Sequence, residues 1–353
     1  MAPISIRLDR VSKRFDHTVK GEVYAVRDVD LSVAEGELLT LLGPSGCGKS
    51  TTLRMIAGFE EPDGGTISID GRDVTHVLPN KRGIGFVFQN YALFPHLSIF
   101  ENVAYGLRVQ GKAEGEIVRA VAEVLELVGL AKYERQQPHQ LSGGEQQRVA
   151  LARAVVFQPK VLLFDEPLSN LDAKLRVEMR EQIRSLQKRI GITTVYVTHD
   201  QEEAMAISDR IAVMERGQIV QDGTARDLYY TPATEFVARF IGRTNLLAGR
   251  VVAGGDVEFE GVRVPLGAKL AAGSAVKLVV RPEMIDMAPG RAGEAGVGKI
   301  LQRTFLGEKT DYEILLGGTR LQACRSDAFR TGTFDVGDEV KVSVDPANIH
   351  LLA

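Results

Sequence analysis

Short apolar runs alternate with helix-period segments along the first two thirds of the chain. Four runs are almost entirely apolar: residues 38–42, 84–88, 161–164 and 194–197. Such runs are typical of strands that are buried on both faces of a parallel sheet. Between them, apolar side chains recur at steps of three or four residues, which places each set on one helix face. Two of these sets are Ile117, Val121, Leu125 and Val128, and Leu175, Met179, Ile183, Leu186 and Ile190. The pattern predicts an α/β fold.

After about residue 242, glycines and β-branched residues dominate and no long helical period appears. Residues 276–280, 311–316 and 340–344 are expected to form short strands between turns. Residues 288–293 are expected to form an exposed loop, because they combine proline, glycine and alanine. The sequence therefore predicts two domains, an α/β domain over 1–242 and an all-β domain over 243–353.

Composition and charge narrow the class of protein. Of 353 residues, 44% are apolar and 25% are charged, which is ordinary for a globular chain. The formal net charge of −3 indicates no broad basic surface, so nucleic acid is not an expected partner. No apolar run approaches the roughly 18 residues of a membrane helix, and no secretory signal is expected. The distant pair Cys47 and Cys324 predicts neither a disulfide framework nor a zinc site, and suits a reducing cytoplasm.

The segment after the first apolar run has the pattern G-x-x-x-x-G-K-[ST]. Its residues are Gly43, Pro44, Ser45, Gly46, Cys47, Gly48, Lys49 and Ser50, and Thr51 follows. Glycines let such a backbone wrap a phosphate, and the N–H groups at the start of the following helix attract it. Lys49 is expected to reach the β- and γ-phosphates, and the Ser50 hydroxyl to bind Mg²⁺. Cys47 is interpreted as a small side chain that fills the turn, with a redox switch as the alternative.

A pair of carboxylates follows the apolar run 161–164. Asp165 and Glu166 are expected at the carboxyl end of a strand, where open α/β sheets bind ligands. There, Asp165 could hold Mg²⁺ through water and Glu166 could act as a general base on the attacking water. A helix-capping cluster is the alternative, which the phosphate loop makes less favoured.

The segment Leu141-Ser142-Gly143-Gly144-Glu145-Gln146-Gln147-Arg148 resembles the signature motif of ATP-binding cassette (ABC) ATPases. Other motifs resemble that family in the same order along the chain. Gln89 resembles its Q-loop glutamine, residues 169–172 its D-loop, and His199 its switch histidine. Phe15 resembles the aromatic residue that stacks on adenine, with Tyr24 as a rival. The resemblance implies a P-loop NTPase (RecA-like) fold with a helical subdomain inserted over about 90–158.

The resemblance also implies a site that two subunits share. One subunit would supply the phosphate loop, Gln89, Asp165, Glu166 and His199, with Ser50, Gln89 and Asp165 around Mg²⁺. Its partner in a homodimer would supply the signature residues, and Asp172 would support the interface. The contributing signature residues would be Ser142, Gly143 and Gly144. Glu166, His199, Gln89 and Lys49 are the candidate catalytic residues, and ATP is the expected substrate.

The part after residue 243 resembles the C-terminal OB-like (TOBE) domain of bacterial importer ATPases, through residues 281–283 and 344–350. Such subunits lie on the cytoplasmic face of the inner membrane and work with separate permease subunits and, indirectly, a substrate-binding protein. A groove lined by Tyr91, Leu93, Phe94, Leu97 and Tyr105 would receive a permease helix, or these residues would only pack the subdomain. The β-domain would join the dimer, with regulator binding as the alternative.

Two other classes remain as alternatives: an ABC ATPase without a transporter, and a metabolic phosphate-loop kinase. The single cassette with an importer-like β-domain disfavours the former, and the signature motif disfavours the latter. The transported substrate is open among ferric iron, polyamine, sulfate, sugar and phosphonate, with a weak preference for polyamine or ferric iron.

Overall fold

The computed structural model describes residues 3–17, 21–267, 269–326 and 332–352. They form two compact units, which divide between residues 225 and 226. No helix among the described residues is long and apolar enough to cross a membrane.

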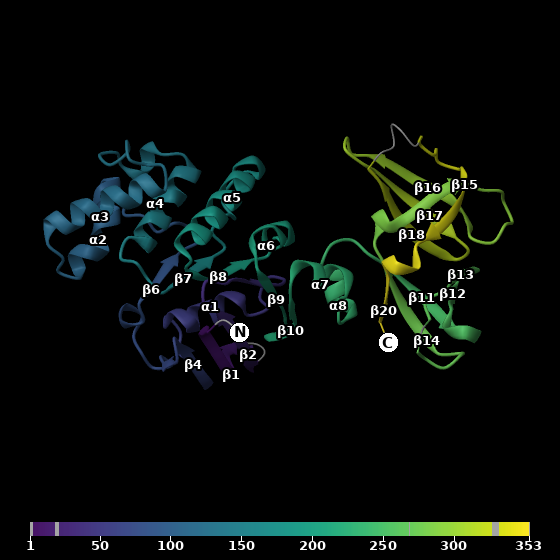
Figure 1. The fold of residues 1–353 in the computed structure, drawn as a ribbon, viewed down its shortest axis with the longest axis horizontal. Helices are drawn as coiled ribbons and strands as arrows, with labels where there is room; N and C mark the ends of the chain where they lie inside the picture. The colour runs from purple at the N-terminus through teal and green to yellow at the C-terminus, as the bar shows by residue number, and fades with distance from the viewer. Residues whose placement is uncertain (1–2, 18–20, 268, 327–331, 353) are drawn as a thin grey trace. The chain divides into compact units, whose positions relative to one another are not determined.

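A six-stranded sheet with the order β10-β9-β3-β8-β7-β6 forms the centre of the first unit (Figure 1). All neighbours in it are parallel except β9 and β10, which form an antiparallel pair. The four apolar runs therefore form the expected buried parallel strands. The strands are β3 (Leu38–Leu42), β6 (Ile84–Val87), β7 (Val161–Asp165), β8 (Thr193–Thr198), β9 (Arg210–Glu215) and β10 (Gln218–Gly223).

Alternate residues of these strands pack into two different apolar clusters, one on each face of the sheet. Leu39 and Leu163 pack with α1, whereas Leu38 and Phe164 pack with α3, α4 and α5. Burial on both faces explains why the runs lack polar alternation. The helices are α1 (Lys49–Ala57), α2 (Ile99–Val109), α3 (Glu114–Leu127), α4 (Gly143–Val155), α5 (Ala173–Ile190) and α6 (Gln201–Ile207).

Helices α2, α3 and α4 lie together, away from α1 (Figure 1). Capping boxes begin two of them: Ser98 with Glu101 at α2, and Ser142 with Glu145 at α4. Each serine accepts a bond from a backbone N–H that the helix itself cannot satisfy. The inserted helical subdomain predicted over about 90–158 spans these three helices.

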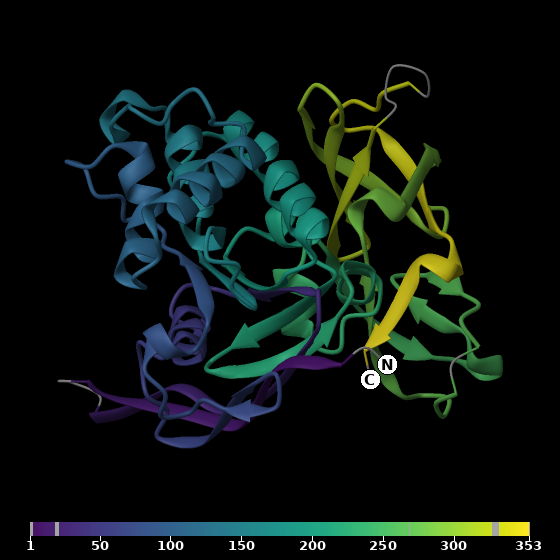
Figure 2. The ribbon, with the colours of Figure 1, turned by 60° about the vertical axis from the view of Figure 1, so that its left-hand side comes forward.

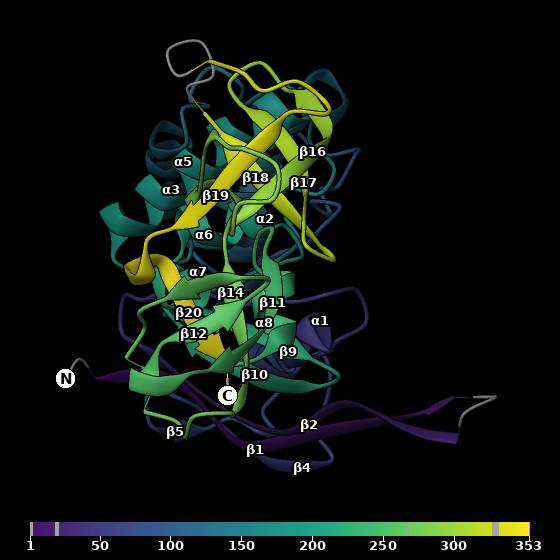
Figure 3. The ribbon, with the colours of Figure 1, turned by 90° about the vertical axis from the view of Figure 1, so that its right-hand side faces the viewer.

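A second, antiparallel sheet of the first unit was not predicted from the sequence. Its order is β2-β1-β4-β5, and its long β1–β2 pair projects from the unit (Figures 2 and 3). Register shifts interrupt the pairing of β1 with β2 and with β4, so the side-chain alternation that marks a strand is broken. The strands are β1 (Ile4–His17), β2 (Gly21–Ala34), β4 (Gly64–Ile69) and β5 (Arg72–Asp73).

The second unit contains two five-stranded antiparallel sheets, with the orders β13-β12-β11-β14-β20 and β15-β19-β16-β17-β18. The strands expected at 276–280, 311–316 and 340–344 are β14, β17 and β19. The strands are β11 (Asn245–Val251), β12 (Val257–Phe259), β13 (Val262–Val264), β14 (Ala275–Val280), β15 (Ile285–Pro289), β16 (Val297–Phe305), β17 (Thr310–Leu316), β18 (Thr319–Arg325), β19 (Glu339–Val344) and β20 (Ile349–Leu352).

Two details of the second unit differ from the sequence expectations. The loop expected at 288–293 begins later, because Ala288 and Pro289 pair with β19 as the end of β15. The boundary predicted at 242/243 also differs from the division at 225/226. Between these points lie α7 (Ala225–Tyr230) and α8 (Glu235–Phe240). The buried Arg281 guanidinium donates to the carbonyl groups of Tyr229, Ala238 and Ile241, which ties these helices to the β-strands.

Candidate functional site

The phosphate loop connects β3 to α1, and its backbone conformation requires glycine at two positions. Gly46 and Gly48 have φ angles of 78° and 107°, which only glycine adopts without strain. A Cβ on Gly48 would also collide with the backbone carbonyl of Ala25. Gly48 caps α1, so the first free N–H groups of that helix face the loop. Of the remaining loop residues, Pro44, Ser45 and Gly46 are exposed, Gly43 and Cys47 are buried, and Thr51 is half-buried.

Lys49 is buried, with 4% of its surface exposed, and its ammonium group lies inside the loop. Its Nζ donates to the carbonyl oxygens of Gly43 at 2.8 Å and Pro44 at 3.0 Å. Cys47 packs into the apolar core beneath the loop, and this burial raises the pKa of its thiol against the opposing charge of Lys49. The one cation of the loop is thus held where a phosphate chain would enter.

The Ser50 hydroxyl and Asp165 meet at the end of β7. Ser50 Oγ donates to Asp165 Oδ1 at 2.8 Å, and Asp165 lies 3.8 Å from the Arg54 guanidinium. A hydroxyl beside a carboxylate is a donor set that suits Mg²⁺, which prefers oxygen ligands and takes one or two from the protein. Among the described residues, no group of three or more His, Cys, Asp or Glu side chains could hold a metal ion. A Mg²⁺ ion here would therefore rely on phosphate and water oxygens for its other ligands.

Glu166 and His199 come together from the ends of neighbouring strands β7 and β8. Glu166 has a left-handed φ of 46°, and its N–H bonds to the carbonyl of Val197. This turn directs its carboxylate to His199, with Oε2 at 3.1 Å from Nδ1. The two side chains line a cavity of about 30 Å³, large enough for a single water molecule. The arrangement can hold one water beside a carboxylate that could accept its proton and the imidazole bonded to that carboxylate.

Gln89 lies just past β6 and is exposed. Its side-chain Nε2 donates to Ser169 Oγ at 3.2 Å, and its backbone carbonyl oxygen accepts a hydrogen bond from Asn170 Nδ2 at 2.9 Å. Ser169 Oγ in turn donates to the carbonyl of Glu166 at 3.0 Å. Hydrogen bonds therefore connect Gln89 to the strand end that carries Asp165 and Glu166.

The signature segment lies at the start of α4. Ser142 caps this helix, and Gly143 and Gly144 form its first turn. A Cβ at Gly143 would lie 3.0 Å from Leu171, and one at Gly144 would lie 2.9 Å from Leu175. The glycines thus allow α4 to approach the segment that leads into α5. Among the described residues of one chain, the Ser142 hydroxyl donates to Glu145 and to no residue of the phosphate loop.

Asp172 caps α5, and its Oδ1 accepts from the N–H of Leu175 at 2.9 Å. Two candidates for stacking on a base, Phe15 and Tyr24, are 43% and 46% exposed and lie on the paired strands β1 and β2. Lys13 lies over the Phe15 ring and Arg14 over the Tyr24 ring. Because Ala25 of β2 touches the phosphate loop at Gly48, this strand pair borders the loop. Both rings therefore remain candidates for stacking on a base.

Glu203 on α6 was missed by sequence reasoning. It is 4% exposed, lines the same small cavity as His199, and accepts hydrogen bonds from the hydroxyls of Thr198, at 2.6 Å, and Tyr196. Burial raises the pKa of Glu203, and these two hydrogen bonds oppose that effect. Only its spacing of three residues from Asp200, which caps α6, distinguishes Glu203 from Glu202 in the sequence.

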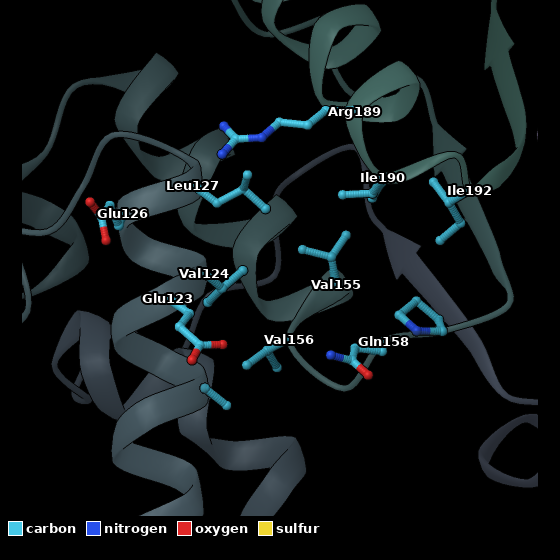
Figure 4. A pocket seen from close by; sticks show the side chains of 12 residues that line it. Glu123, Val124, Glu126, Leu127, Val155, Val156, Gln158, Arg189, Ile190 and Ile192 are labelled. Atoms are coloured by element: carbon cyan, nitrogen blue, oxygen red, sulfur yellow. The ribbon is translucent and has the colours of Figure 1, made fainter.

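The groove residues expected for a permease helix occupy different environments. Tyr91 is 7% exposed and belongs to the apolar core of the helices, whereas Tyr105 is 48% exposed. The rings of Phe94 and Tyr105 lie 4.8 Å apart. A separate cavity of about 810 Å³ lies between α3 and the ends of α4 and α5 (Figure 4). Apolar residues such as Val124 and Val155 line it, and none of the predicted site residues does.

A phosphate loop before α1, with two carboxylates and a histidine at adjacent strand ends, defines an ATPase of the phosphate-loop class. Comparison with known proteins supports this class. The ABC transporter family matches residues 26–169, and the TOBE domain family matches residues 278–352. The dimeric structure of MJ0796, a bacterial ABC transporter cassette, covers 62% of this chain and 98% of its own, with a TM-score of 0.55 and 33% identity.

Curated relatives cover nearly the whole chain. The spermidine/putrescine import ATP-binding protein PotA of Rubrobacter xylanophilus is 47% identical over 99% of this chain and 94% of that protein. The Fe(3+) ions import ATP-binding protein FbpC of Agrobacterium fabrum is 49% identical over 88% of each chain. The chain therefore belongs to the ATP-binding proteins of the ABC transporter family. It is an ATPase that binds ATP.

Proposed function

We propose that this protein is the ATP-hydrolysing subunit of a bacterial importer and acts as a homodimer on the cytoplasmic face of the inner membrane. Separate permease subunits would form the channel, and a binding protein would deliver the solute. The relatives that match almost the full chain are import ATP-binding proteins. A dimeric cassette among the similar structures supports the homodimer.

The Glu166–His199 pair beside Ser50 and Asp165 is the observation that carries the hydrolytic role. Lys49 and the N–H groups at the start of α1 would bind the β- and γ-phosphates. Ser50, Gln89 and Asp165 would hold Mg²⁺, which when bound neutralises charge on the phosphate oxygens. Glu166 would accept the proton of the attacking water, and His199 would orient that water.

The signature residues explain why two chains would be needed. Ser142, Gly143 and Gly144 stand at the N-terminus of α4, whose helix dipole favours a negative charge. In a dimer, this helix end of one subunit would face the γ-phosphate bound by its partner, and Asp172 would support the contact. ATP would then join the two subunits, and loss of the γ-phosphate would release them. Such a cycle of closure and release suits the movement of a permease.

The transported solute is a polyamine or ferric iron in this proposal, because relatives of both kinds match at similar identity. The first experiment measures phosphate release by the purified protein with MgATP, using Lys49→Ala as the inactive variant and Arg119→Lys as a surface control. Absence of hydrolysis that depends on Lys49 would contradict the enzymatic role.

The second experiment tests the transport role. The tagged protein is purified from membranes in detergent, and a permease is expected to co-purify. Uptake of labelled putrescine and of ferric iron is then compared between a strain with the gene and one without it. A protein that hydrolyses ATP but brings down no membrane subunit would favour an ABC ATPase without a transporter.

A further inference from the structure

The backbone directly after Gln89 holds two consecutive residues in an unusual conformation. Tyr91 and Ala92 have φ angles of 61° and 48°, in the left-handed region, although neither is glycine, asparagine or aspartate. In this region the Cβ of an L-residue crowds its own backbone, so the conformation costs free energy at each position. A pair of such residues persists only where surrounding groups hold it.

Arg153 on α4 holds Tyr91 and Ala92 in this conformation through two hydrogen bonds. Its Nη1 donates to the carbonyl of Ala92 at 2.6 Å, and its Nη2 donates to the carbonyl of Tyr91 at 2.7 Å. One planar guanidinium thus spans the two carbonyl groups of the left-handed pair through two separate nitrogens at fixed spacing, whereas an ammonium offers a single nitrogen. Burial lowers the pKa of Arg153, and no described carboxylate forms an ion pair with it. The Arg153 guanidinium therefore pairs with backbone carbonyl groups and not with a carboxylate.

The helix that carries Arg153 is itself fixed close to the same segment. Gly85 of β6 packs against α4 so tightly that a Cβ would collide with the carbonyl of Ala154, the residue after Arg153. Gln89, at the start of this segment, bonds to Ser169 and Asn170. The segment 89–92 is therefore held between α4 and the residues that follow Glu166.

We propose that Arg153 is a positioning residue that sets Gln89 in the ATP site by clamping the left-handed Tyr91–Ala92 pair to the helix of the signature segment. The proposal rests on the hydrolytic role of Gln89 in the proposed function. Because α4 begins at Ser142, the clamp links the helix that would face a partner's nucleotide to the glutamine of its own site. Arg153 acts through the backbone and touches neither nucleotide nor water.

In the first test, lysine replaces Arg153, so that a single ammonium group takes the place of the planar guanidinium. Arg153→Lys keeps the positive charge but replaces two separate Nη donors with one ammonium group on a shorter side chain, which weakens the hold on the two carbonyl groups. The kcat of ATP hydrolysis is expected to fall roughly 10- to 100-fold, as for loss of one charged hydrogen bond. The KM for ATP should change less than about threefold, because the phosphate loop is untouched. Amide hydrogen exchange of the peptide covering 88–94 should accelerate.

The second test is a rescue that a merely structural role for Arg153 would not produce. Ala92 is exposed, so Ala92→Gly removes little packing and lets the backbone adopt its φ of 48° without strain. In the Arg153→Lys background, Ala92→Gly should restore most of the kcat and the slow exchange of 88–94. Ala92→Val alone should reproduce the defect, because a β-branched residue strongly disfavours this region.

Arg119→Lys is the matched control, since Arg119 also donates to a backbone carbonyl, that of Gly115 in its own helix α3, and does not contact the segment 89–92. It should leave kcat and exchange unchanged. Wild-type kcat and exchange in Arg153→Lys, or a defect that Ala92→Gly does not reverse, would overturn the clamp. If Arg153→Lys fails to fold, normal kcat and exchange in Ala92→Val would overturn it equally. A wild-type protein without ATPase activity would refute the proposed function instead, and exchange at 88–94 would still test the clamp.

Discussion

Replacement of Glu166 by glutamine tests the chemical step directly. The variant keeps the length of the side chain and its position on the left-handed turn after β7. Its amide can still form a hydrogen bond with His199 Nδ1, which lies 3.1 Å from the carboxylate. An amide cannot accept a proton from water at neutral pH. The substitution therefore removes the proposed base and leaves the phosphate loop, Ser50 and Asp165 in place.

The expected loss follows from the role assigned to Glu166. A positioned general base contributes roughly 10²- to 10⁴-fold to turnover, or about 3–5 kcal/mol in the activation barrier. The affinity for MgATP should stay within about threefold or rise, because one negative charge near the triphosphate is removed. A variant that binds ATP without hydrolysing it should also accumulate as the ATP-bound dimer.

Three measurements separate these effects: phosphate release in a single turnover, equilibrium binding of a fluorescent ATP analogue, and mass in solution with and without MgATP. Glu202→Gln is the matched control, since Glu202 is an exposed glutamate that lies three residues from His199. It should behave as the wild type. Turnover of Glu166→Gln within about threefold of the wild type would remove this residue from the mechanism.

Three further predictions concern groups outside the chemical step. On a Cys324→Ser background, the raised pKa of Cys47 should make its alkylation at pH 7 slower than that of a free thiol, and the rate should increase with pH. Alkylation as fast as that of a free thiol would contradict the burial of Cys47. Arg281→Met should lower the free energy of unfolding of the full chain by at least about 3 kcal/mol, because five hydrogen bonds to backbone carbonyl groups are lost, those to Ala238 and Ile241 being buried. A shift under about 1 kcal/mol in denaturant titrations would show that these groups find other partners. Burial alone would raise the pKa of Asp209, but hydrogen bonds from Arg184, the Leu38 backbone and Lys188 hold this pKa well below its usual value. Asp209→Asn should therefore destabilise the fold at pH 7, and progressively less below about pH 4, where the stability contributed by the ionised wild-type carboxylate is lost. An equal destabilisation at pH 3 and pH 7 would refute this linkage between pKa and stability.

The sequence allowed the central sheet and the chemical groups to be predicted because both leave local patterns. A strand buried on both faces needs an unbroken apolar run, as in residues 38–42, and a phosphate loop needs glycines at fixed spacing. The carboxylates at 165 and 166 follow such a run directly. Each of these features depends on a few neighbouring residues, so no knowledge of the tertiary fold is needed.

The antiparallel sheet and the helices near residue 230 leave no such pattern. In β1 and β2, register shifts mix inward and outward positions, so the alternation of a half-buried strand is lost. Helices α7 and α8 have six residues each, too short to show a helical period. Their placement depends on Arg281, which lies 40 to 52 residues further along the chain than the carbonyl groups it binds there. This long-range contact explains why the predicted boundary and the compact units differ.

Three arginines each donate long-range hydrogen bonds to two or more backbone carbonyl groups. Arg82 binds the carbonyls of Met55 and Ile56 at the end of α1, Arg153 binds those after Gln89, and Arg281 binds those of α7 and α8. Burial lowers the pKa of all three guanidinium groups. Each serves carbonyl groups at a helix end or in an irregular segment, where the backbone cannot satisfy itself. Since arginine stays protonated even when partly buried, it can supply several donors there without a counter-charge. In the proposed function, the motifs visible in the sequence would supply the reacting groups. The contacts that would hold α1 and Gln89 in place come from arginines that no local sequence pattern distinguishes.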